Sequence, residues 1–356
     1  MNARLKVALI FGGRSGEHEV SLRSALSVAE GLAERHEVLP LLVEKAGGWR
    51  LQEGPVPRPA GGEPVFLATS PDEGGRLRRL QDAHELARPD VFFPVLHGTY
   101  GEDGTVQGLF ELAGVPYVGA GVAASAAAMD KAIMKSLFAQ AGLPQVEHRV
   151  LLRRDAAAAE ARLLDELGLP VFVKPANLGS SVAVSKVKVP EALAPALALA
   201  FSYDRKVVVE RGHDVREIEV AILGNDDPEA SLPGEIVPDR EFYDYDSKYA
   251  ATSLTELHIP ARVSAAQSDE VRRLGLAAFQ AVDAAGYARV DCFLERSTGR
   301  LLLNEINTIP GFTSISMYPK LWQATGLGYP DLLARLVALG LERHAERARL
   351  STHYGG

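Results

Sequence analysis

Strand and helix signals alternate along the first third of the chain, and this alternation constrains the fold more than any other feature. Apolar runs at 7–11, 36–44 and 90–98 indicate strands, while apolar residues at helical spacing mark 21–34 and 103–114. A β-α-β order favours a parallel sheet with helices outside it. The turns after 7–11 and 90–98 should then lie at the carboxyl end of that sheet, where such folds bind ligands.

The rest of the chain continues with mixed strand and helix patterns. Strands are expected at 148–152, 169–175, 206–212 and 217–224, and helices at 129–142, 155–168 and near 266–284. Residues 46–75 are rich in glycine and proline, which suggests surface excursions or a short hairpin around Trp49. With a boundary near 119–128, we predict domains at 1–120, 121–211 and 212–356.

Composition excludes several classes of protein. The 356 residues carry a formal net charge of -8 with scattered lysine and arginine, so nucleic acid is not expected as a partner. A single cysteine, Cys292, rules out a disulfide within the chain and fits a reducing compartment. The apolar run near the N-terminus is short and ends in glycines, so we interpret it as a first strand rather than a signal peptide. No run approaches the ~20 residues of a membrane span, and we expect a cytoplasmic protein with no membrane partner.

A hairpin at 287–307 brings polar residues together. Its turn, Ser297-Thr298-Gly299, places glycine where a positive φ is wanted. Counting outward from Thr298, four polar residues pair across the hairpin and share one face: Asp291 opposite Glu305, and Arg289 opposite Asn307. Cys292 falls on the opposite face and is expected in the core.

This polar face has two readings. Facing carboxylates raise each other's pKa, and a divalent cation removes that cost. Asp291, Glu305 and Asn307 offer the oxygen donors that Mg²⁺ prefers, and no histidine or cysteine that would suit zinc. The alternative is a solvated strand end in which Arg289 forms a salt bridge.

A small-residue loop follows the strand at 171–175. Such a loop between two strands, with Gly179 and the serines after it, can lay backbone N–H groups on phosphate oxygens beside Lys174. The spacing of a P-loop is absent, and a simple hairpin turn is an equal alternative. Lys131 is either a second phosphate ligand or a solvated helix residue. Glu210, at a strand edge, either accepts an adenine amino group or lies on the surface.

Taken together, these pieces resemble the ATP-grasp fold, and more closely the D-alanine–D-alanine ligase family. Seven motifs occur in that family's order and cover nearly the whole chain: FGGRSGEHEVS (11–21), HGTYGEDGTVQG (97–108), GAGVAASAAAMDK (119–131), VKPANLGSSV (173–182), EFYDYDSKY (241–249), ARVD (288–291) and NEINTIPGFTS (304–314). The resemblance implies an N-terminal α/β parallel-sheet domain followed by two α+β subdomains that close on ATP, with a mobile loop at 238–253.

The resemblance also implies an activity. The family joins two D-alanine molecules with ATP, through a D-alanyl phosphate and a tetrahedral intermediate, to make a peptidoglycan precursor. ATP is a substrate, and two Mg²⁺ ions, for which Mn²⁺ can substitute, assist. The family is usually homodimeric.

Roles of individual residues follow from the matching motifs. The implied metal ligands are Asp291, Glu305 and Asn307, with Glu305 bridging two ions. The implied ATP contacts are Lys131, Lys174 and Lys248 on phosphates, Ser181 in the covering loop, and Glu210 and Glu217 on adenine and ribose. The implied substrate contacts are Glu17 on the first ammonium with Ser180 and Tyr249 beside it, Arg289 and Gly311 on the oxyanion, and Ser316, Met317 and His97 near the second D-alanine.

Other readings remain open within the sequence. A D-alanine–D-lactate ligase, or another ATP-grasp amino-acid ligase, is the alternative closest in chemistry, but Lys248-Tyr249 points to the dipeptide ligase. A non-catalytic nucleotide sensor on the same fold should have lost metal ligands or the arginine, and none is lost. A dinucleotide-binding dehydrogenase is a weaker alternative, because the glycines after the first strand of this chain lack the G-x-G-x-x-G spacing. Residues 176–178 are less polar than the matching stretch of the family. Residues 46–90 match the family poorly, and we expect them to be a peripheral segment or a subunit contact.

Overall fold

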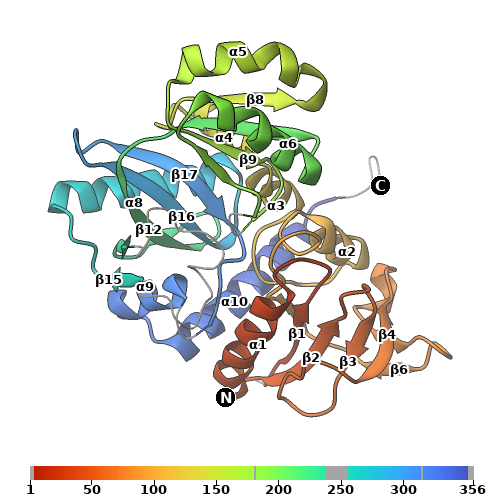
Figure 1. The fold of residues 1–356 in the computed structure, drawn as a ribbon. Coiled ribbons are helices and arrows are strands. Elements are labelled where there is room, and N and C mark those ends of the chain that lie inside the picture. The colour runs from red at the N-terminus through yellow and green to blue at the C-terminus, as the bar shows by residue number, and fades with distance from the viewer. Residues whose placement is uncertain (1–3, 180–181, 238–254, 314–315, 352–356) are drawn as a thin grey trace.

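The computed structural model describes residues 4–179, 182–237, 255–313 and 316–351, without the side chains of 157–161. These residues form three β-sheets with helices packed around them. In Figure 1 the N-terminal sheet lies at the lower right, the central sheet at the top and the C-terminal sheet at the left. Their ends converge on the middle of the molecule, where the candidate site lies.

The N-terminal sheet has seven strands in the order β6-β5-β4-β3-β2-β1-β7. Its elements are β1 (Lys6–Gly12), α1 (His18–Ala33), β2 (Glu37–Val43), β3 (Trp49–Leu51), β4 (Glu63–Leu67), η1 (Pro71–Glu73), β5 (Leu77–Arg79), β6 (Glu85–Ala87), β7 (Val91–Pro94) and α2 (Thr105–Ala113). β1 is the centre of the parallel part, since it pairs with β2 and with β7 in parallel. This confirms the parallel arrangement for those three strands.

The sheet also has an antiparallel part that the sequence did not predict, because β3 to β6 extend it as antiparallel strands. The hairpin expected around Trp49 is present, because Trp49 pairs with Val43, and the chain after it continues the sheet rather than forming a surface excursion. The short connections between these strands allow only antiparallel pairing. Val65, Leu67 and Leu77 bury their side chains in the same core as Phe92 and Phe110, which explains why these short strands stay in the sheet.

The central sheet is antiparallel, in the order β10-β9-β11-β8. Its elements are α3 (Val122–Met129), α4 (Lys131–Gln140), β8 (His148–Leu152), η2 (Arg153–Asp155), α5 (Ala156–Leu167), β9 (Val171–Pro175), β10 (Ser185–Val187), η3 (Pro190–Ala192), α6 (Leu193–Tyr203) and β11 (Lys206–Arg211). Alternate valines of β9 and β11 are buried with apolar residues of α5 and α6. The opposite face of the sheet receives α4 through Ala132, which packs on Val208.

The C-terminal sheet runs in the order β15-β14-β12-β16-β17, with β13 paired to β12. Its elements are β12 (Val215–Gly224), β13 (Glu229–Ala230), β14 (Gly234–Val237), β15 (Glu256–His258), α8 (Ala265–Ala281), β16 (Gly286–Glu295) and β17 (Leu301–Asn307). Ser264 begins α8 with a capping box to Gln267. Cys292 is buried in the core between this sheet and α8, as the sequence predicts.

Two C-terminal helices, α9 (Met317–Thr325) and α10 (Tyr329–Arg347), return to the first sheet. Leu332 and Leu336 of α10 share one hydrophobic core with Val7 and Leu9 of β1. The first and last parts of the chain are thus held together, which fixes the C-terminal sheet beside the turns that follow β1 and β7. None of the described helices is both long and apolar enough to cross a membrane.

Candidate active site

A row of three carboxylates crosses the C-terminal sheet. Glu219 on β12 lies directly opposite Asp291 on β16, which in turn lies opposite Glu305 on β17. Directly opposed residues point to the same face, so the three acids share it. The pairing of Asp291 with Glu305 and of Arg289 with Asn307 confirms the hairpin register expected from the sequence. Glu219 was missed, although Glu217-Ile218-Glu219 has the same period-two signal as the hairpin.

The two strands of the hairpin do not keep one register from the turn to these pairs, as the prediction assumed. Nearer the turn, Leu294 pairs with Leu301 and Cys292 with Leu303, one residue out of step with Asp291 and Glu305. A β-bulge between Asp291 and Cys292 absorbs the difference and leaves Asn304 as the extra residue. The bulge is therefore what aims Glu305 at Asp291.

Arg289 neutralises part of this row. Its guanidinium binds Asp291 through two hydrogen bonds of 2.6 and 2.7 Å, and its Nε lies 3.1 Å from Glu219. Asn307 also donates to Asp291, at 3.1 Å. Burial alone would lower the pKa of Arg289, but Asp291 and Glu219 outweigh it and raise that pKa. The salt bridge of the alternative reading is present, but the cluster is largely buried rather than solvated.

The donor set fits a hard divalent cation better than a soft one. Asp291, Glu305 and Asn307 supply only oxygen donors on adjacent strands. One guanidinium faces three carboxylates, so additional positive charge would stabilise the row. Within the part of the chain that the structure describes, no group of three His, Cys, Asp or Glu side chains is placed to hold a metal ion. Mg²⁺ typically keeps phosphate oxygens and water in its shell beside one or two carboxylates.

A second cluster, of opposite charge, lies between α4 and the central sheet. The Glu210 carboxylate on β11 is 2.9 Å from the ammonium of Lys135 on α4 and 2.6 Å from that of Lys174 on β9. The side chains of Lys135 and Glu210 are 1% and 3% exposed, so the surface reading of Glu210 is wrong. Lys135 was missed in the sequence, although it stands one helical turn after Lys131.

These neighbours set the charge states of the cluster. Burial would raise the pKa of Glu210, but Lys135 and Lys174 outweigh it and hold that pKa far below its usual range. Burial would lower the pKa of Lys174, but Glu210, with smaller effects from Glu305 and Glu217, raises it. The carboxylate row is thus close enough to act on Lys174.

Lys131 bridges the two clusters. Its ammonium lies 3.6 Å from Glu305 and donates to the Leu178 carbonyl at 2.8 Å. Its side chain is 13% exposed, so the interpretation of Lys131 as a solvated helix residue is wrong. The small-residue loop begins at a fixed point, because Asn177 donates twice to Asp204, at 2.8 and 2.9 Å. β9 and β10 on either side of this loop pair in antiparallel, as expected.

Glu17 lies where the N-terminal domain meets this loop. A Cβ added to Gly98 would lie 2.8 Å from its carboxylate, and one added to Gly179 would lie 3.1 Å from it. A further carboxylate, Glu102, accepts a 2.7 Å hydrogen bond from the Gly98 amide. Burial, together with the Glu17 charge, raises the pKa of Glu102 to about 8. The sequence reading assigned Glu102 no role, although it lies in the HGTYGEDG stretch.

His97 holds the turn after β17. Its Nδ1 donates to the Ile309 carbonyl at 3.1 Å, and its Nε2 lies 3.1 Å from the Ser24 hydroxyl. Ser24 also accepts from the Phe312 amide at 3.4 Å. Burial lowers the pKa of His97, which fits a neutral ring making both contacts. His97 and Ser24 therefore position the segment that contains Gly311.

Gly311 leaves no space for a side chain. A Cβ there would lie 2.8 Å from the Ser316 hydroxyl, which accepts from the Thr313 amide at 3.0 Å. Met317, the next residue, begins α9 and buries its side chain in the core. Any ligand contact of Met317 is therefore best assigned to its backbone.

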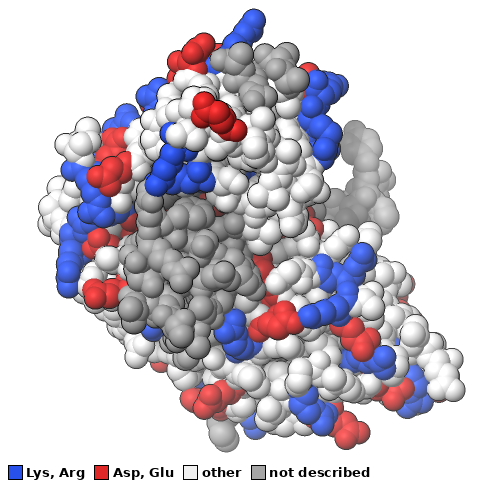
Figure 2. Space-filling model, in the orientation of Figure 1, with Lys and Arg blue, Asp and Glu red and all other residues white. Residues whose placement is uncertain are grey.

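Four predicted site residues lie outside the described residues: Ser180, Ser181, Lys248 and Tyr249. Among the others, three contacts join separate regions of the chain: Glu17 with Gly179, His97 with Ile309, and Lys131 with Glu305. Figure 2 shows acidic and basic groups interspersed around the grey area on this face.

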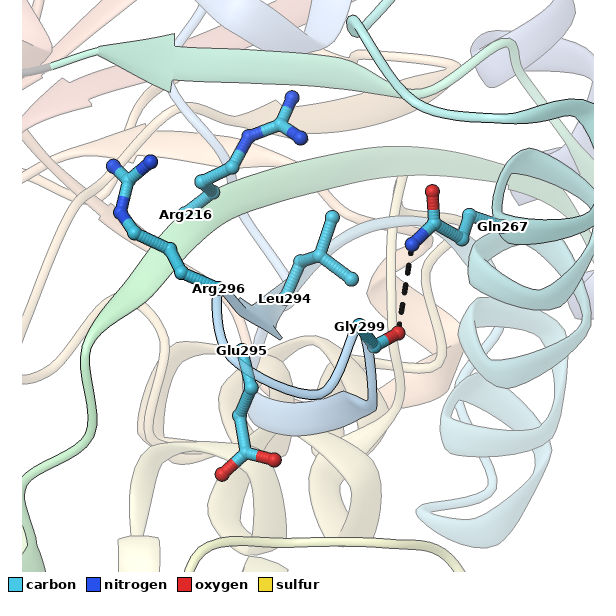
Figure 3. Close-up of a pocket in the computed structure, with 6 residues that line it drawn as sticks. All are labelled: Arg216, Gln267, Leu294, Glu295, Arg296 and Gly299. Atoms are coloured by element: carbon cyan, nitrogen blue, oxygen red, sulfur yellow. Dashed lines mark hydrogen bonds between the residues drawn. The ribbon is translucent and has the colours of Figure 1, made fainter.

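A separate cavity of about 220 Å³ lies at the turn of the hairpin, away from these contacts. In Figure 3, Arg216 and Arg296 flank it, and Gln267 donates to the Gly299 carbonyl. Arg216 is committed to Glu235 through hydrogen bonds of 2.6 and 2.7 Å, and Arg296 binds Asp214 at 3.1 Å. Both arginines are therefore already paired with carboxylates, and the Arg216 pair is the more buried of the two.

Comparison with known proteins covers almost the whole chain. Two family models match, D-ala D-ala ligase N-terminus at residues 6–120 and D-ala D-ala ligase C-terminus at 137–338. A D-alanine--D-alanine ligase of Heliobacterium modesticaldum is 51% identical, over 97% of each chain. D-alanine--D-alanine ligase A of Salmonella typhimurium is 45% identical, over 98% of this chain and 99% of its own.

Solved structures agree with these matches. The D-alanine-D-alanine ligase from Coxiella burnetii superposes with a TM-score of 0.87 and 36% identity, covering 97% of this chain and 96% of its own. The VanG D-Ala:D-Ser ligase from Enterococcus faecalis superposes with a TM-score of 0.85 and 34% identity, covering 95% of this chain and 100% of its own.

Proposed function

Because the chain belongs to the D-alanine–D-alanine ligase family, we propose that it joins two D-alanine molecules to D-alanyl-D-alanine for peptidoglycan synthesis. The reaction uses ATP and releases ADP and phosphate. The observation that carries this function is the meeting of two opposite charge clusters, with Lys131 only 3.6 Å from Glu305. Lysines beside oxygen donors for a metal are what phosphoryl transfer requires.

In the first step, the carboxylate of one D-alanine attacks the γ-phosphate of ATP. An anion attacking a polyanion is repelled, and we assign Lys131 and Lys174 to offset that repulsion. Asp291, Glu305 and Asn307 would hold Mg²⁺, which supplies further positive charge at the transferring phosphoryl group. Phosphorylation turns the carboxylate oxygen into a good leaving group.

In the second step, the amine of the other D-alanine attacks the activated carbonyl. We assign Arg289 Nη1 and the Gly311 amide to the negatively charged oxygen of the tetrahedral intermediate, since the carboxylates already engage Nε and Nη2 of Arg289. Donors of this kind are typically worth roughly 3 kcal/mol each. Glu17 receives the ammonium of the first D-alanine, and loss of phosphate yields the dipeptide.

The remaining assignments follow the family motifs. Ser180 and Tyr249 accompany Glu17, Ser181 and Lys248 cover the phosphates, and Glu210 and Glu217 contact adenine and ribose. Ser316, the backbone of Met317, and His97 lie near the second D-alanine. The domain ranges 1–120, 121–211 and 212–356 and a homodimer belong to the same proposal. Size-exclusion chromatography with light scattering tests the homodimer.

Phosphate release from ATP tests the function directly. The enzyme is assayed with D-alanine alone, with L-alanine, and with D-alanine plus D-lactate or D-serine, and the products are identified by mass spectrometry. We expect D-alanyl-D-alanine from D-alanine alone. Turnover with L-alanine, or a mixed product formed in preference to the dipeptide, would contradict the proposed substrates.

A further inference from the structure

Lys135 is the most buried of the three charged side chains in the cluster of Glu210, and the proposed mechanism assigns it no role. Its side chain is 1% exposed, and its ammonium lies 2.9 Å from Glu210. A buried ammonium is costly unless it is paired, and its burial lowers the pKa of Lys135. Lys135 is held by α4, whose residue Ala132 packs directly on Val208 of the strand that carries Glu210.

The two lysines around Glu210 differ in exposure. The side chain of Lys174 is 12% exposed, against 1% for Lys135. Lys174 therefore faces the more open side of the cluster, and Lys135 closes its inner end. α4 begins beside the end of β9, the strand that carries Lys174, because the Lys131 amide donates to the Ala176 carbonyl at 2.9 Å.

The different positions imply different tasks. Lys174 is 2.6 Å from Glu210, yet it is also the lysine assigned to a nucleotide phosphate. Once Lys174 shares its ammonium with a phosphate, Glu210 needs another counter-ion, because an uncompensated buried carboxylate is strongly destabilising. His148 lies opposite Glu210 on β8, but burial and the nearby Lys135 charge lower the pKa of His148 and keep it neutral.

We propose that Lys135 is a positioning residue for nucleotide binding: it is the permanent counter-ion of Glu210, and this releases Lys174 to reach a phosphate. The inference rests on the proposed function in one respect, the contact of Lys174 with ATP. Lys135 itself touches neither ATP nor D-alanine. Its loss should therefore weaken ATP binding and leave D-alanine binding intact.

A double-mutant cycle tests this role. Binding of a non-hydrolysable ATP analogue is measured by calorimetry for the wild type, Lys135→Met, Glu210→Gln and the double variant. Lys135→Met should weaken binding roughly tenfold to hundredfold, because Lys174 is then retained by Glu210. In the Glu210→Gln background the same change should have an effect of about twofold or less, because no carboxylate needs compensation.

Steady-state kinetics and a matched control separate this role from general destabilisation. Lys135→Met should raise the KM for ATP while the KM for D-alanine stays within about twofold. Lys206→Met removes a lysine that pairs with Asp130 between the same helix and sheet. This control should lower the melting temperature without weakening nucleotide binding more than about twofold.

Three outcomes would overturn the role of Lys135: wild-type ATP affinity in Lys135→Met, an equal loss in both backgrounds, or parallel increases in both KM values. If Lys135→Met does not fold, the comparison of Glu210→Gln with the double variant decides. Equal affinities support the role, and a further tenfold loss contradicts it. Failure of the proposed function is a distinct result, in which the wild type binds the nucleotide but D-alanine elicits no phosphate release.

Discussion

The central and C-terminal sheets bury charge in opposite ways. In the central sheet, two ammonium groups enclose the single carboxylate of Glu210. In the C-terminal sheet, Arg289 pairs with two of the three carboxylates, Glu219 and Asp291, and the third, Glu305, lies 3.6 Å from the Lys131 ammonium. The first cluster has spare positive charge and suits a polyanion, while the second has spare negative charge and suits a cation.

The difference shows how two clusters, each costly by itself, become complementary parts of one site. A buried charge without compensation is unfavourable. In the proposed function, a metal-bound nucleotide would bring negative phosphates to the ammonium cluster and a cation to the carboxylate row. Lys131, which donates to the Leu178 carbonyl of the small-residue loop and lies 3.6 Å from Glu305, is where the two clusters meet.

The largest expected effect comes from neutralising the carboxylate row. Glu305→Gln keeps the shape of the side chain but removes the charge of a proposed metal ligand. Because the metal supplies several kcal/mol of charge stabilisation, phosphate release should fall by roughly 10²–10³-fold. Phosphate release with saturating ATP and D-alanine measures it, and chelation by EDTA should produce a similar loss that added Mg²⁺ reverses.

The matched control for this change is Glu229→Gln. Glu229 lies on β13 of the same sheet and binds Arg335 at the surface. Its neutralisation should leave phosphate release unchanged. Near-wild-type ligation by Glu305→Gln would contradict the assignment of Glu305 as a metal ligand. The carboxylate row would then not differ from the ammonium cluster in the way proposed.

A smaller effect should follow from weakening the ammonium cluster. Lys174→Met removes the outer cation while Lys135 still compensates Glu210, so the fold should survive. Loss of a charged contact to phosphate should raise the KM for ATP roughly tenfold or more and leave the KM for D-alanine unchanged. Steady-state kinetics with each substrate varied in turn measures both. An increase in the KM for D-alanine alone would contradict the assignment of Lys174 to ATP.

The smallest effect concerns a third way of burying a carboxylate, which is to protonate it. The pKa of Glu102 is raised to about 8 in the folded protein, from an unfolded value near 4.5. Between those values the folded protein holds a proton that the unfolded chain lacks, so stability is lost as the pH rises through this range. Glu102→Gln removes that loss. Its melting temperature should match the wild type near pH 5 and exceed it by a few degrees near pH 8.

Melting temperatures of Glu102→Gln and the wild type, measured by scanning fluorimetry from pH 5 to pH 8, test this prediction. Glu53→Gln, which changes an exposed carboxylate of the same domain, should show no pH-dependent gain over the wild type. If Glu102→Gln shows no gain either, then Glu102 is ionised in the folded protein and the contrast among the three carboxylate environments fails.

Much of the site was predictable because it follows local patterns. The alternation of side chains along a hairpin places Asp291 and Glu305 on one face, and the alternation of strands and helices predicts the parallel strands β1, β2 and β7. Apart from the hairpin around Trp49, the antiparallel strands up to residue 87 were not predicted, because each is only three to five residues long and is stabilised by burial against the rest of the sheet.

The sequence by itself determined which residue types were available and which of them share a strand face or a helix. It could not show that Glu219 joins the carboxylate row, that Lys135 reaches Glu210, or that Glu102 lies near Glu17. Those proximities depend on strand pairing and on helix packing between residues tens of positions apart. Only the tertiary structure decides such pairings, because the free energy of a buried charge depends on neighbours that the chain brings in from elsewhere.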